Sequence, residues 1–529
     1  MFDMIIKGGA VIDGTGSDAF PADVGILGAR IAKIGRLSSG EGKRVIEAEG
    51  LAVSPGFIDM HSHEFTILTD PPPDSKIRQG VTTEVMGNCG ESVAPALGAG
   101  REHVRSLLSA FGEYEEEIGW SGLAEFLSLL ENRGLVNHYL PLVGHGTVRS
   151  SVMGLENRAP DSGELETMKR LVARSMEEGA WGLSSGLIYA PAMYARTEEL
   201  IELAKVAAAY KGIYTSHIRG EHEGVLMSAL TEAIRIGKEA GLPVEISHLK
   251  VYGKQLWGKA GDALKKLEEA RQDGVDVTAD AYPYVATHTT LKTVLPSWAQ
   301  EGGTARMVER LKDASLRRKM REEMGKGEVV FFKGVDWDGV MLVKSNREPA
   351  LDGGNIAEIA ALRGEDPYQV VFDILVEEPG MRANYFALDE GDVQTILAHP
   401  MVMIGSDSYA VSDQGILGEG KPHPRGAGTF PRVLGKYVRE ENLFRLEEAV
   451  RKMTSFPARK LGLKDRGRIE EGAFADLVLF DPEKVADRAT FVAPQRYPRG
   501  IEYVLLDGEV VVESGEYTKQ LVGKVLRHA

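Results

Sequence analysis

The stretch GFIDMHSHEF, residues 56–65, places two histidines one residue apart directly after a short apolar run. Successive side chains on a β-strand point to opposite faces, so His61 and His63 would share a face, with backbones about 6–7 Å apart. That separation lets two imidazoles bind one metal ion. A strand that runs into a loop with two solvated histidines explains this stretch equally well, so the rest of the chain must decide.

Outward from this stretch, the middle of the chain alternates short apolar runs with helical patterns. Residues 164–178 and 226–240, for example, have apolar side chains three and four positions apart, as amphipathic helices do. Eight strands alternating with helices predict an α/β fold, a (β/α)8 TIM-like barrel over residues 56–464. The expected strands are 56–61, 82–88, 137–143, 180–184, 212–217, 244–248, 275–280 and 402–407.

Three segments depart from this alternation. The interval between the seventh and eighth strands is longer than one loop and one helix require, and residues 288–347 within it are rich in charge. We predict an inserted small domain or lid there. Residues 1–55 and 465–529 contain short apolar runs bounded by Gly, Pro or Asp. We expect these two ends to pair into one small β-sandwich domain.

Composition excludes some partners. The chain has 529 residues and a formal net charge of -16, without a long Lys/Arg cluster, so no basic face is available for nucleic acid. No window approaches the roughly 20 apolar residues of a membrane span, and the apolar run before Lys7 is too short for a signal peptide. We therefore expect a cytoplasmic protein with no nucleic acid or membrane partner. No feature indicates the oligomeric state.

Side chains that bind metals follow most of the predicted strands. The carboxyl ends of barrel strands open onto one face, where the active sites of such barrels are built. A single histidine at a strand end is more often structural, but four histidines with a thiol and carboxylates favour a catalytic zinc site. In chain order, these residues are His61, His63, Cys89, His217, His248, Asp280 and Asp407, with Tyr282 beside them.

Cys89 is the only cysteine, so no intramolecular disulfide can form. Packing, metal binding and nucleophilic chemistry remain open for it. Metal binding accounts for the histidines as well, because a thiol bound to zinc is deprotonated.

With these motifs, the whole chain resembles the amidohydrolase superfamily and, more narrowly, the N-acyl-D-amino-acid deacylases, the D-aminoacylase group. The His61/His63 pair, the late Asp407 and ADLVLFD near the end are typical of the superfamily. Narrower motifs point to the deacylases: GNCG at 87–90, SHLK at 247–250, DAYPY at 280–284 and HPRGAGTFPR at 423–432.

The resemblance implies a tight zinc site formed by Cys89, His217 and His248. It also implies a second, weakly or variably occupied metal position outlined by His61, His63 and Asp407. Hydantoinase and dihydroorotase types use a carboxylated lysine after the fourth strand. This chain has WGLSSG at 181–186, with no lysine. The resemblance implies that the cysteine takes the bridging role instead. This difference disfavours a cyclic amide as substrate.

The resulting hypothesis is zinc-assisted hydrolysis of the linear amide of a small N-acyl-D-amino acid. Asp407 would orient the water, accept its proton and return that proton to the departing nitrogen. From the residues alone, Asp407 could equally be a helix N-cap. Preference for the D over the L substrate rests on the resemblance.

The amino-acid half of such a substrate carries a carboxylate that needs cationic partners. Lys250 lies two residues after His248, on the same strand face, and Arg425 could bind a carboxylate through both guanidinium nitrogens. The resemblance adds Tyr282 and Tyr189 as hydroxyl donors, and Thr287 stands where relatives often have serine. On composition alone, Lys250 and the tyrosines could be ordinary rim residues.

Three further residues are predicted from their place beside these motifs. His145 follows the third strand and is expected near the site, and Asp59 is expected to orient the first histidine pair. His222, beside two glutamates, is expected to be solvated.

Three alternatives stay open. One is another amidohydrolase, such as a dipeptidase that releases a C-terminal D-residue. A second is a non-catalytic amidohydrolase-like scaffold, which the complete set of candidate ligands disfavours. The third is a cysteine hydrolase with Cys89 as nucleophile.

Overall fold

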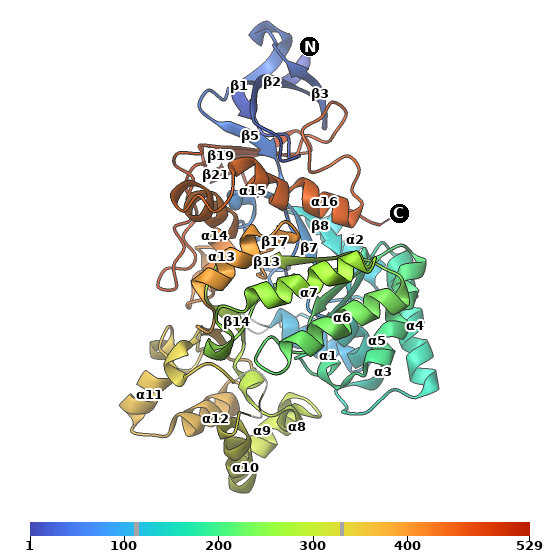
Figure 1. Cartoon of the computed structure of the whole chain (residues 1–529), viewed down its shortest axis with the longest axis vertical. Helices are drawn as coiled ribbons and strands as arrows, with labels where there is room; N and C mark the ends of the chain where they lie inside the picture. Colours follow the sequence, from blue (N-terminus) through green and yellow to red (C-terminus); the bar gives the residue numbers. More distant parts are fainter. Residues whose placement is uncertain (110–115, 328, 330–332, 529) are drawn as a thin grey trace.

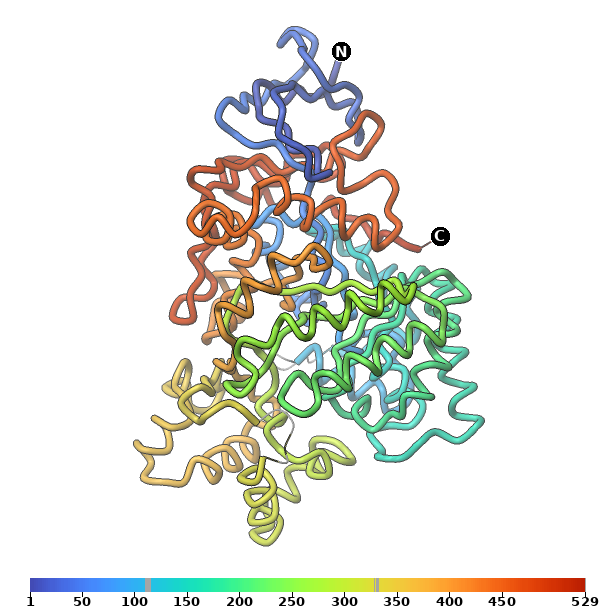
Figure 2. The backbone as a smooth tube through the Cα atoms, in the orientation of Figure 1, coloured from blue at the N-terminus to red at the C-terminus, as the bar shows by residue number. Residues whose placement is uncertain are grey.

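The computed structural model describes residues 1–109, 116–327, 329 and 333–528. The N-terminus lies at one end of the molecule, the C-terminus lies at the side beside α16 (Ser455–Leu461), the barrel occupies the middle, and a yellow helical segment lies at the end opposite the N-terminus (Figure 1). The backbone tube shows the blue first strands beside the red last segment (Figure 2). Segments from the beginning and from the last part of the sequence therefore lie side by side.

Within the described residues, eight parallel strand positions form the barrel, in agreement with the prediction. Two sheets, β6-β7-β8 and β9-β10-β11-β12-β13-β17, are joined where Leu142 N donates to Met86 O at 2.8 Å. A parallel bridge between Ser62 and Ser408 closes the ring. The strands are β6 (Phe57–Asp59), β7 (Val81–Met86), β8 (His138–Pro141) continued by β9 (Val143–Gly144), β10 (Gly182–Gly186), β11 (Ile213–His217), β12 (Val244–Ile246), β13 (Val277–Ala281) and β17 (Val402–Ile404).

Helices cover the outside of the barrel. In α6, the apolar side chains Leu230, Ala233 and Ile236 face inward at helical spacing, and the helix ends at Ala240, before Gly241, whose φ of 74° favours glycine. The helices are α1 (Gly100–Leu108), α2 (Leu123–Arg133), α3 (His145–Met153), α4 (Ser162–Glu177), α5 (Thr197–Ala209), α6 (Leu226–Ala240), α7 (Ala260–Gln272), α13 (Glu390–Ala398), α14 (Arg425–Arg432), α15 (Leu446–Met453) and α16 (Ser455–Leu461).

Strands from both termini share one sheet, in the order β21-β20-β19-β18-β5-β1-β2-β3, with β4 paired to β1. The two ends meet where β5 runs antiparallel to β18, with Ala52 opposite Phe480. Ile6, Val53, Leu479 and Leu505 form part of its core. The strands are β1 (Phe2–Val11), β2 (Phe20–Leu27), β3 (Arg30–Gly35), β4 (Gly42–Glu47), β5 (Ala52–Pro55), β18 (Leu477–Phe480), β19 (Ile501–Leu506), β20 (Glu509–Glu513) and β21 (Glu516–Tyr517).

The segment between β13 and β17 extends beyond the predicted insertion of 288–347. Its antiparallel sheet has the order β14-β16-β15, and the middle strand lies well after Arg347. Charged residues are concentrated in the first helices of this segment, whereas α12 is apolar, like a helix of the barrel. The predicted boundary at residue 347 therefore lies too early in the chain. The elements are β14 (Thr287–Thr290), α8 (Ser297–Gln300), α9 (Thr304–Lys312), α10 (Ala314–Gly325), β15 (Val340–Leu342), α11 (Ile356–Arg363), α12 (Pro367–Glu377) and β16 (Arg382–Tyr385). Positions 328 and 330–332 of the predicted insertion lie outside the described residues.

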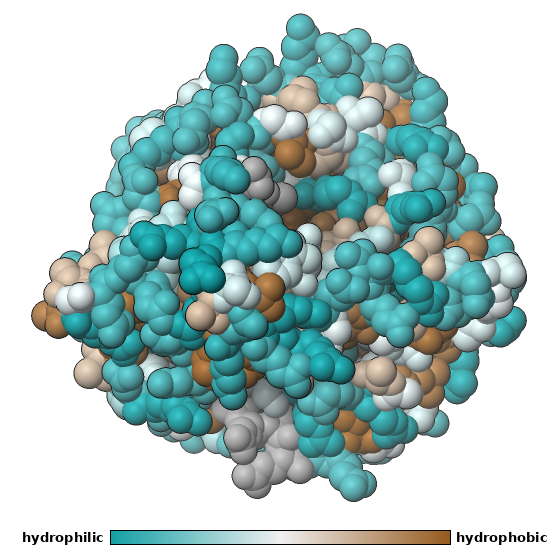
Figure 3. All heavy atoms as spheres, turned by 90° about the horizontal axis from the view of Figure 1, so that it is seen from below, coloured by the Kyte–Doolittle hydropathy of each residue, from teal (hydrophilic) through white to brown (hydrophobic). Residues whose placement is uncertain are grey.

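The surface agrees with the acidic, polar composition. Seen from the end that carries the insertion, the face is mostly hydrophilic, with apolar side chains in small separate groups (Figure 3). In the part of the chain that the structure describes, no helix combines the length and the apolar character needed to cross a bilayer.

Candidate active site

Four donor atoms converge at the carboxyl ends of the barrel strands, with the Cys89 sulfur at their centre. Cys89 Sγ lies 3.3 Å from His61 Nε2, 3.5 Å from His217 Nδ1 and 3.5 Å from His248 Nε2. All four side chains are buried. The strand ends that supply them are those of β6, β7, β11 and β12, so the barrel brings together residues spread over almost 190 positions of sequence.

The donor set of Cys89, His217 and His248 fits a zinc ion. Bonds of about 2.0–2.3 Å in tetrahedral geometry place donors about 3.3–3.8 Å apart. Both sulfur-to-nitrogen distances in this group satisfy that range, whereas His217 Nδ1 and His248 Nε2 are 2.8 Å apart. The two nitrogens would separate by about half an ångström to bind one ion.

A second group shares the same sulfur. His61, His63 and Asp407 join Cys89 in a set of donors that all lie within 4.8 Å of one another. Asp407 Oδ1 is 3.3 Å from His63 Nε2 and 3.5 Å from His61 Nε2. Cys89 belongs to both groups, so one thiolate could bridge two adjacent ions.

The backbone conformation of three of these residues directs their side chains toward the other donor atoms. Cys89, His248 and Asp407 have φ values of 56°, 39° and 50°, in the left-handed region that residues with a Cβ rarely adopt. Each such conformation costs about 1–3 kcal/mol and concentrates at functional sites. Close packing explains one glycine of the GNCG motif, because a Cβ on Gly90 would lie 2.8 Å from Gly186 N.

Burial governs protonation here. It raises the pKa of the Cys89 thiol well above its usual value, and Asp407 adds to that rise. Burial lowers the pKa of His217 and of His248 well below the usual range. The protein alone therefore favours neutral imidazoles and a thiol, and a divalent cation would release the thiol proton on binding.

Asp407 is held as a carboxylate. Burial raises its pKa, but Arg425 and the surrounding histidines outweigh burial and hold the pKa well below its usual value. Arg425 NH1 donates to Asp407 Oδ2 at 2.7 Å, so the other oxygen, Oδ1, faces the histidines. The helix N-cap alternative does not apply, because the next two helical elements, η8 (Gly415–Gly418) and α14, have Gln414 and Pro424 at their N-cap positions.

Two carboxylates support the histidines, in different ways. Asp280 Oδ2 is 3.4 Å from His61 Nδ1, and Asp280 Oδ1 accepts from His248 N at 2.9 Å. Asp59 instead accepts from the backbone N of His61 at 3.2 Å and from Lys76 at 2.5 Å. Asp59 therefore fixes the loop, whereas Asp280 contacts the ring. Lys76 is fully buried, and the sequence offered no signal that distinguished it from a surface lysine.

The predicted substrate residues gather beside the donors. Arg425 lies with its guanidinium carbon 4.6 Å from the centre of the Tyr282 ring, and Lys250 Nζ lies 5.7 Å from that centre. The Tyr189 ring contacts His217 edge-on, with centroids 5.1 Å apart. Thr287 is buried at the start of β14.

Two histidines lie in other surroundings. The expectation that His222 is solvated is wrong, because its side chain is buried, with 5% of its surface exposed. His145 opens α3, and its Nε2 is 2.8 Å from Glu199 Oε1, a carboxylate that also pairs with Arg149. Neither histidine belongs to the two donor groups.

Sequence reasoning missed Glu221. Its side chain is buried and accepts from Lys250 Nζ at 2.7 Å, and it lies 3.2 Å from His248 Nδ1. The available signal was its place in SHIRGE, four residues after His217.

Comparisons with known proteins agree with this geometry. A model of the amidohydrolase family, Amidohydro_3, matches residues 44–512. A D-aminoacylase of Alcaligenes xylosoxydans xylosoxydans is 40% identical over 99% of this chain and 97% of its own.

Two solved structures are similar over nearly the whole chain. A D-aminoacylase with a binuclear metal centre, described by one-metal activation and second-metal attenuation, is 38% identical, with a TM-score of 0.83 over 100% of both chains. An N-acyl-D-glutamate deacylase of Bordetella bronchiseptica, complexed with zinc and a phosphonate mimic of the tetrahedral intermediate, is 35% identical. Its TM-score is 0.82 over 99% of both chains.

Proposed function

The chain belongs to the amidohydrolase family, and on that basis we propose that it hydrolyses N-acyl-D-amino acids to a carboxylate and a free D-amino acid with the help of zinc. The observation that carries the proposal is the convergence of Cys89, His217 and His248 on one point, with Asp407 beside it. The D configuration of the substrate is taken from the names of the relatives.

Cys89, His217 and His248 would hold the zinc ion, and His61, His63 and Asp407 would outline a second, weaker position. A bound zinc ion supplies Lewis-acid chemistry, which polarises a carbonyl and makes water more acidic. The neutral imidazoles and the sulfur are the donors that this ion prefers.

Asp407 is the general base and acid of the proposal. Its low pKa keeps it ionised at neutral pH, and Oδ1 faces the donors while Arg425 holds Oδ2. In this role it accepts a proton from the attacking water and delivers it to the nitrogen that leaves as the amine.

Lys250, Arg425 and Tyr282 would bind the carboxylate of the substrate, with Tyr189 and Thr287 beside them. Arg425 and Lys250 expose only 2% and 5% of their surfaces. Each already pairs with a protein carboxylate, but the buried Arg425 Nε has no hydrogen-bond partner among the described residues and could donate to a substrate carboxylate. Burial raises the pKa of Tyr282, so its hydroxyl remains a hydrogen-bond donor.

The other two classes of function fit the site less well. A nucleophilic cysteine needs an accessible thiolate of lowered pKa, whereas Cys89 is 3% exposed and its pKa is raised. A scaffold would have no use for three left-handed residues that aim donor atoms at one point. A cytoplasmic location stays a prediction of the sequence.

A substrate panel on protein of measured zinc content tests the proposal. It would contain N-acetyl-D-amino acids with neutral and acidic side chains, their L enantiomers, and dipeptides that end in a D-residue. We expect zinc-dependent turnover of N-acetyl-D substrates and little of the L series. Zinc-loaded protein that cleaves none of the N-acetyl-D substrates, or that prefers the dipeptides, would contradict it.

A further inference from the structure

Glu221 and Lys250 compete for one nitrogen of a metal ligand. Lys250 Nζ lies 2.7 Å from His248 Nδ1, 2.7 Å from Glu221 Oε1 and 2.8 Å from His248 O. Glu221 Oε1 is itself 3.2 Å from His248 Nδ1. The three side chains therefore form a closed triangle, and each exposes 5% of its surface or less.

A neutral imidazole carries one hydrogen, so His248 has two possible arrangements in this triangle. With the hydrogen on Nε2, that nitrogen donates to His217 Nδ1, 2.8 Å away, and Nδ1 accepts from Lys250. With the hydrogen on Nδ1, the Nε2 lone pair is free and Nδ1 needs an acceptor. A lysine ammonium only donates and a carboxylate only accepts, so Lys250 favours the first arrangement and Glu221 the second.

A metal ion bound through His248 Nε2 requires the second arrangement, because the lone pair must point to the ion. We propose that Glu221 is a positioning residue that selects this tautomer, and that zinc binding thereby releases Lys250 from His248 toward the substrate carboxylate. The inference rests on the proposed function of the site.

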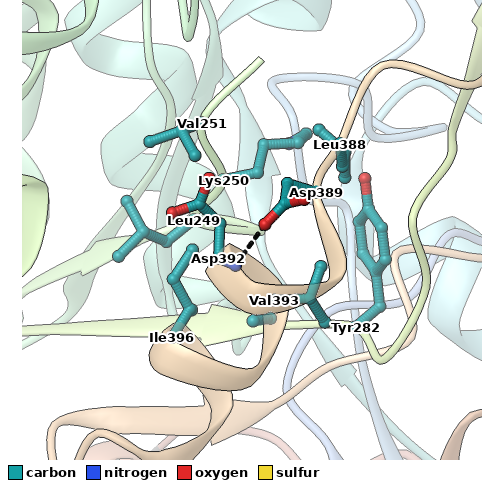
Figure 4. Close-up of a pocket in the computed structure, with 10 residues that line it drawn as sticks. Leu249, Lys250, Val251, Tyr282, Leu388, Asp389, Asp392, Val393 and Ile396 are labelled. Carbon is teal, nitrogen blue, oxygen red and sulfur yellow. Dashed lines mark hydrogen bonds between the residues drawn. The ribbon is translucent and has the colours of Figure 1, made fainter. Parts of the chain in front are cut away.

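The surroundings of Lys250 support this release. Its side chain borders a cavity of about 10 Å³, which Tyr282, Leu388 and Asp389 also line (Figure 4). Lys250 and Arg425 approach the same Tyr282 ring. An ammonium released from His248 would stay beside the Tyr282 ring that the Arg425 guanidinium also approaches. Glu221 is fixed meanwhile, since its carbonyl accepts from Tyr252 N at 2.8 Å.

Zinc affinity separates the roles of the two residues. Competition with a chelator would give the Kd for zinc of the wild-type protein, Glu221→Gln, Lys250→Met and the control Glu223→Gln. Glu223 is exposed and pairs with Lys333 at 3.7 Å, outside the triangle. Loss of the Glu221 charge should weaken zinc binding by about 10- to 100-fold, as for other residues that orient ligands.

Lys250→Met should bind zinc as tightly as the wild type or more tightly, because it removes the donor that competes for Nδ1, while its KM rises at least about tenfold. A merely structural role of the two residues predicts weaker zinc binding in both variants. Opposite changes in zinc affinity would therefore distinguish the positioning role from a structural one. Glu221→Asp, which keeps the charge, should lie between wild type and Glu221→Gln and serves if the latter does not fold.

Unchanged zinc affinity in Glu221→Gln, or an equal loss in Lys250→Met, would overturn the inference. Either result together with wild-type turnover of N-acetyl-D-amino acids leaves the proposed function intact. Wild-type protein that binds zinc without turning over those substrates would instead contradict the proposed function.

Discussion

Two buried clusters, at opposite ends of the barrel strands, both have the residue types and spacing of a metal site. One is the Cys89 centre, and the other joins His138, Asp476 and Asp507. In the second, Arg466 donates to Asp476 and to Asp507 at 2.8 Å, Arg466 NH1 lies 3.1 Å from His138 Nε2, and Lys524 donates to Asp507 at 2.5 Å. Protein cations thus occupy the place that an ion would take.

The histidines show the same difference. His138 Nδ1 accepts from Lys524 N at 3.1 Å, so its hydrogen lies on Nε2, toward Asp476. This cluster ties the start of β8 to the terminal sheet, whereas the Cys89 centre lies where the strands end. Donor spacing alone therefore does not define a metal site. What separates the two clusters is that Arg466 contacts all three donor residues of the second, whereas Arg425 holds one oxygen of Asp407 and leaves the other facing the histidines.

The largest expected effect is at the Cys89 centre. Cys89→Ala removes the donor shared by both ligand groups, so kcat/KM should fall by at least about 10³-fold, because metal assistance contributes several kcal/mol. The zinc content should fall with it. Urea unfolding of the zinc-free proteins is the control, since this change removes a small side chain without leaving a charge unpaired. Retention of both zinc and activity would remove the basis of the comparison.

The next largest effect on activity is expected for Asp407→Asn. The amide cannot accept the proton, so kcat should fall by about 10²- to 10⁴-fold. Tight zinc should remain, since Cys89, His217 and His248 are unchanged. Steady-state kinetics on an N-acetyl-D-amino acid, with zinc measured on the same sample, checks both statements. Full turnover in this variant would show that the base is another group.

The ionic cluster should respond in stability instead. Arg466→Met leaves the buried Asp476 without its arginine and leaves Asp507 to pair with Lys524, which should lower the free energy of unfolding by about 3–5 kcal/mol. Activity per folded, zinc-loaded molecule should stay close to wild type. Urea denaturation followed by fluorescence, with titration of active sites, separates the two quantities. A variant that is stable but inactive would place Arg466 in the catalytic machinery.

The smallest expected effect is a change in stability at low pH. Burial raises the pKa of Asp476, but His138 and Arg466 outweigh burial and hold it below its usual value. Because the folded-state pKa is the lower one, the unfolded chain binds more protons in acid, and this contribution to stability is lost as pH falls below about 4. The difference in urea midpoint between wild type and Asp476→Asn, in zinc-free protein, should therefore stay constant from pH 7 to about pH 5 and shrink as the pH falls below about 4. A constant difference would contradict this cause.

Local patterns predicted the barrel and the family resemblance. The apolar runs coincide with the barrel strands because parallel strands are buried on both faces, and the His61/His63 spacing indicated a metal site. Contacts between residues far apart in sequence could not be predicted from local patterns. Glu221 and Lys76 look like surface charges in sequence, and only the fold shows that each is buried against a partner. The left-handed conformation of Cys89 likewise has no sequence signal beyond the flanking glycines.

X-ray absorption at the zinc edge tests the central claim most directly. If Cys89, His217 and His248 share one ion, the spectrum of the zinc-loaded wild-type protein should show one sulfur neighbour at about 2.3 Å and nitrogen or oxygen neighbours at about 2.0–2.1 Å. Any zinc that Cys89→Ala still binds should lack the sulfur. A first shell of nitrogen and oxygen alone in the wild type would contradict the account.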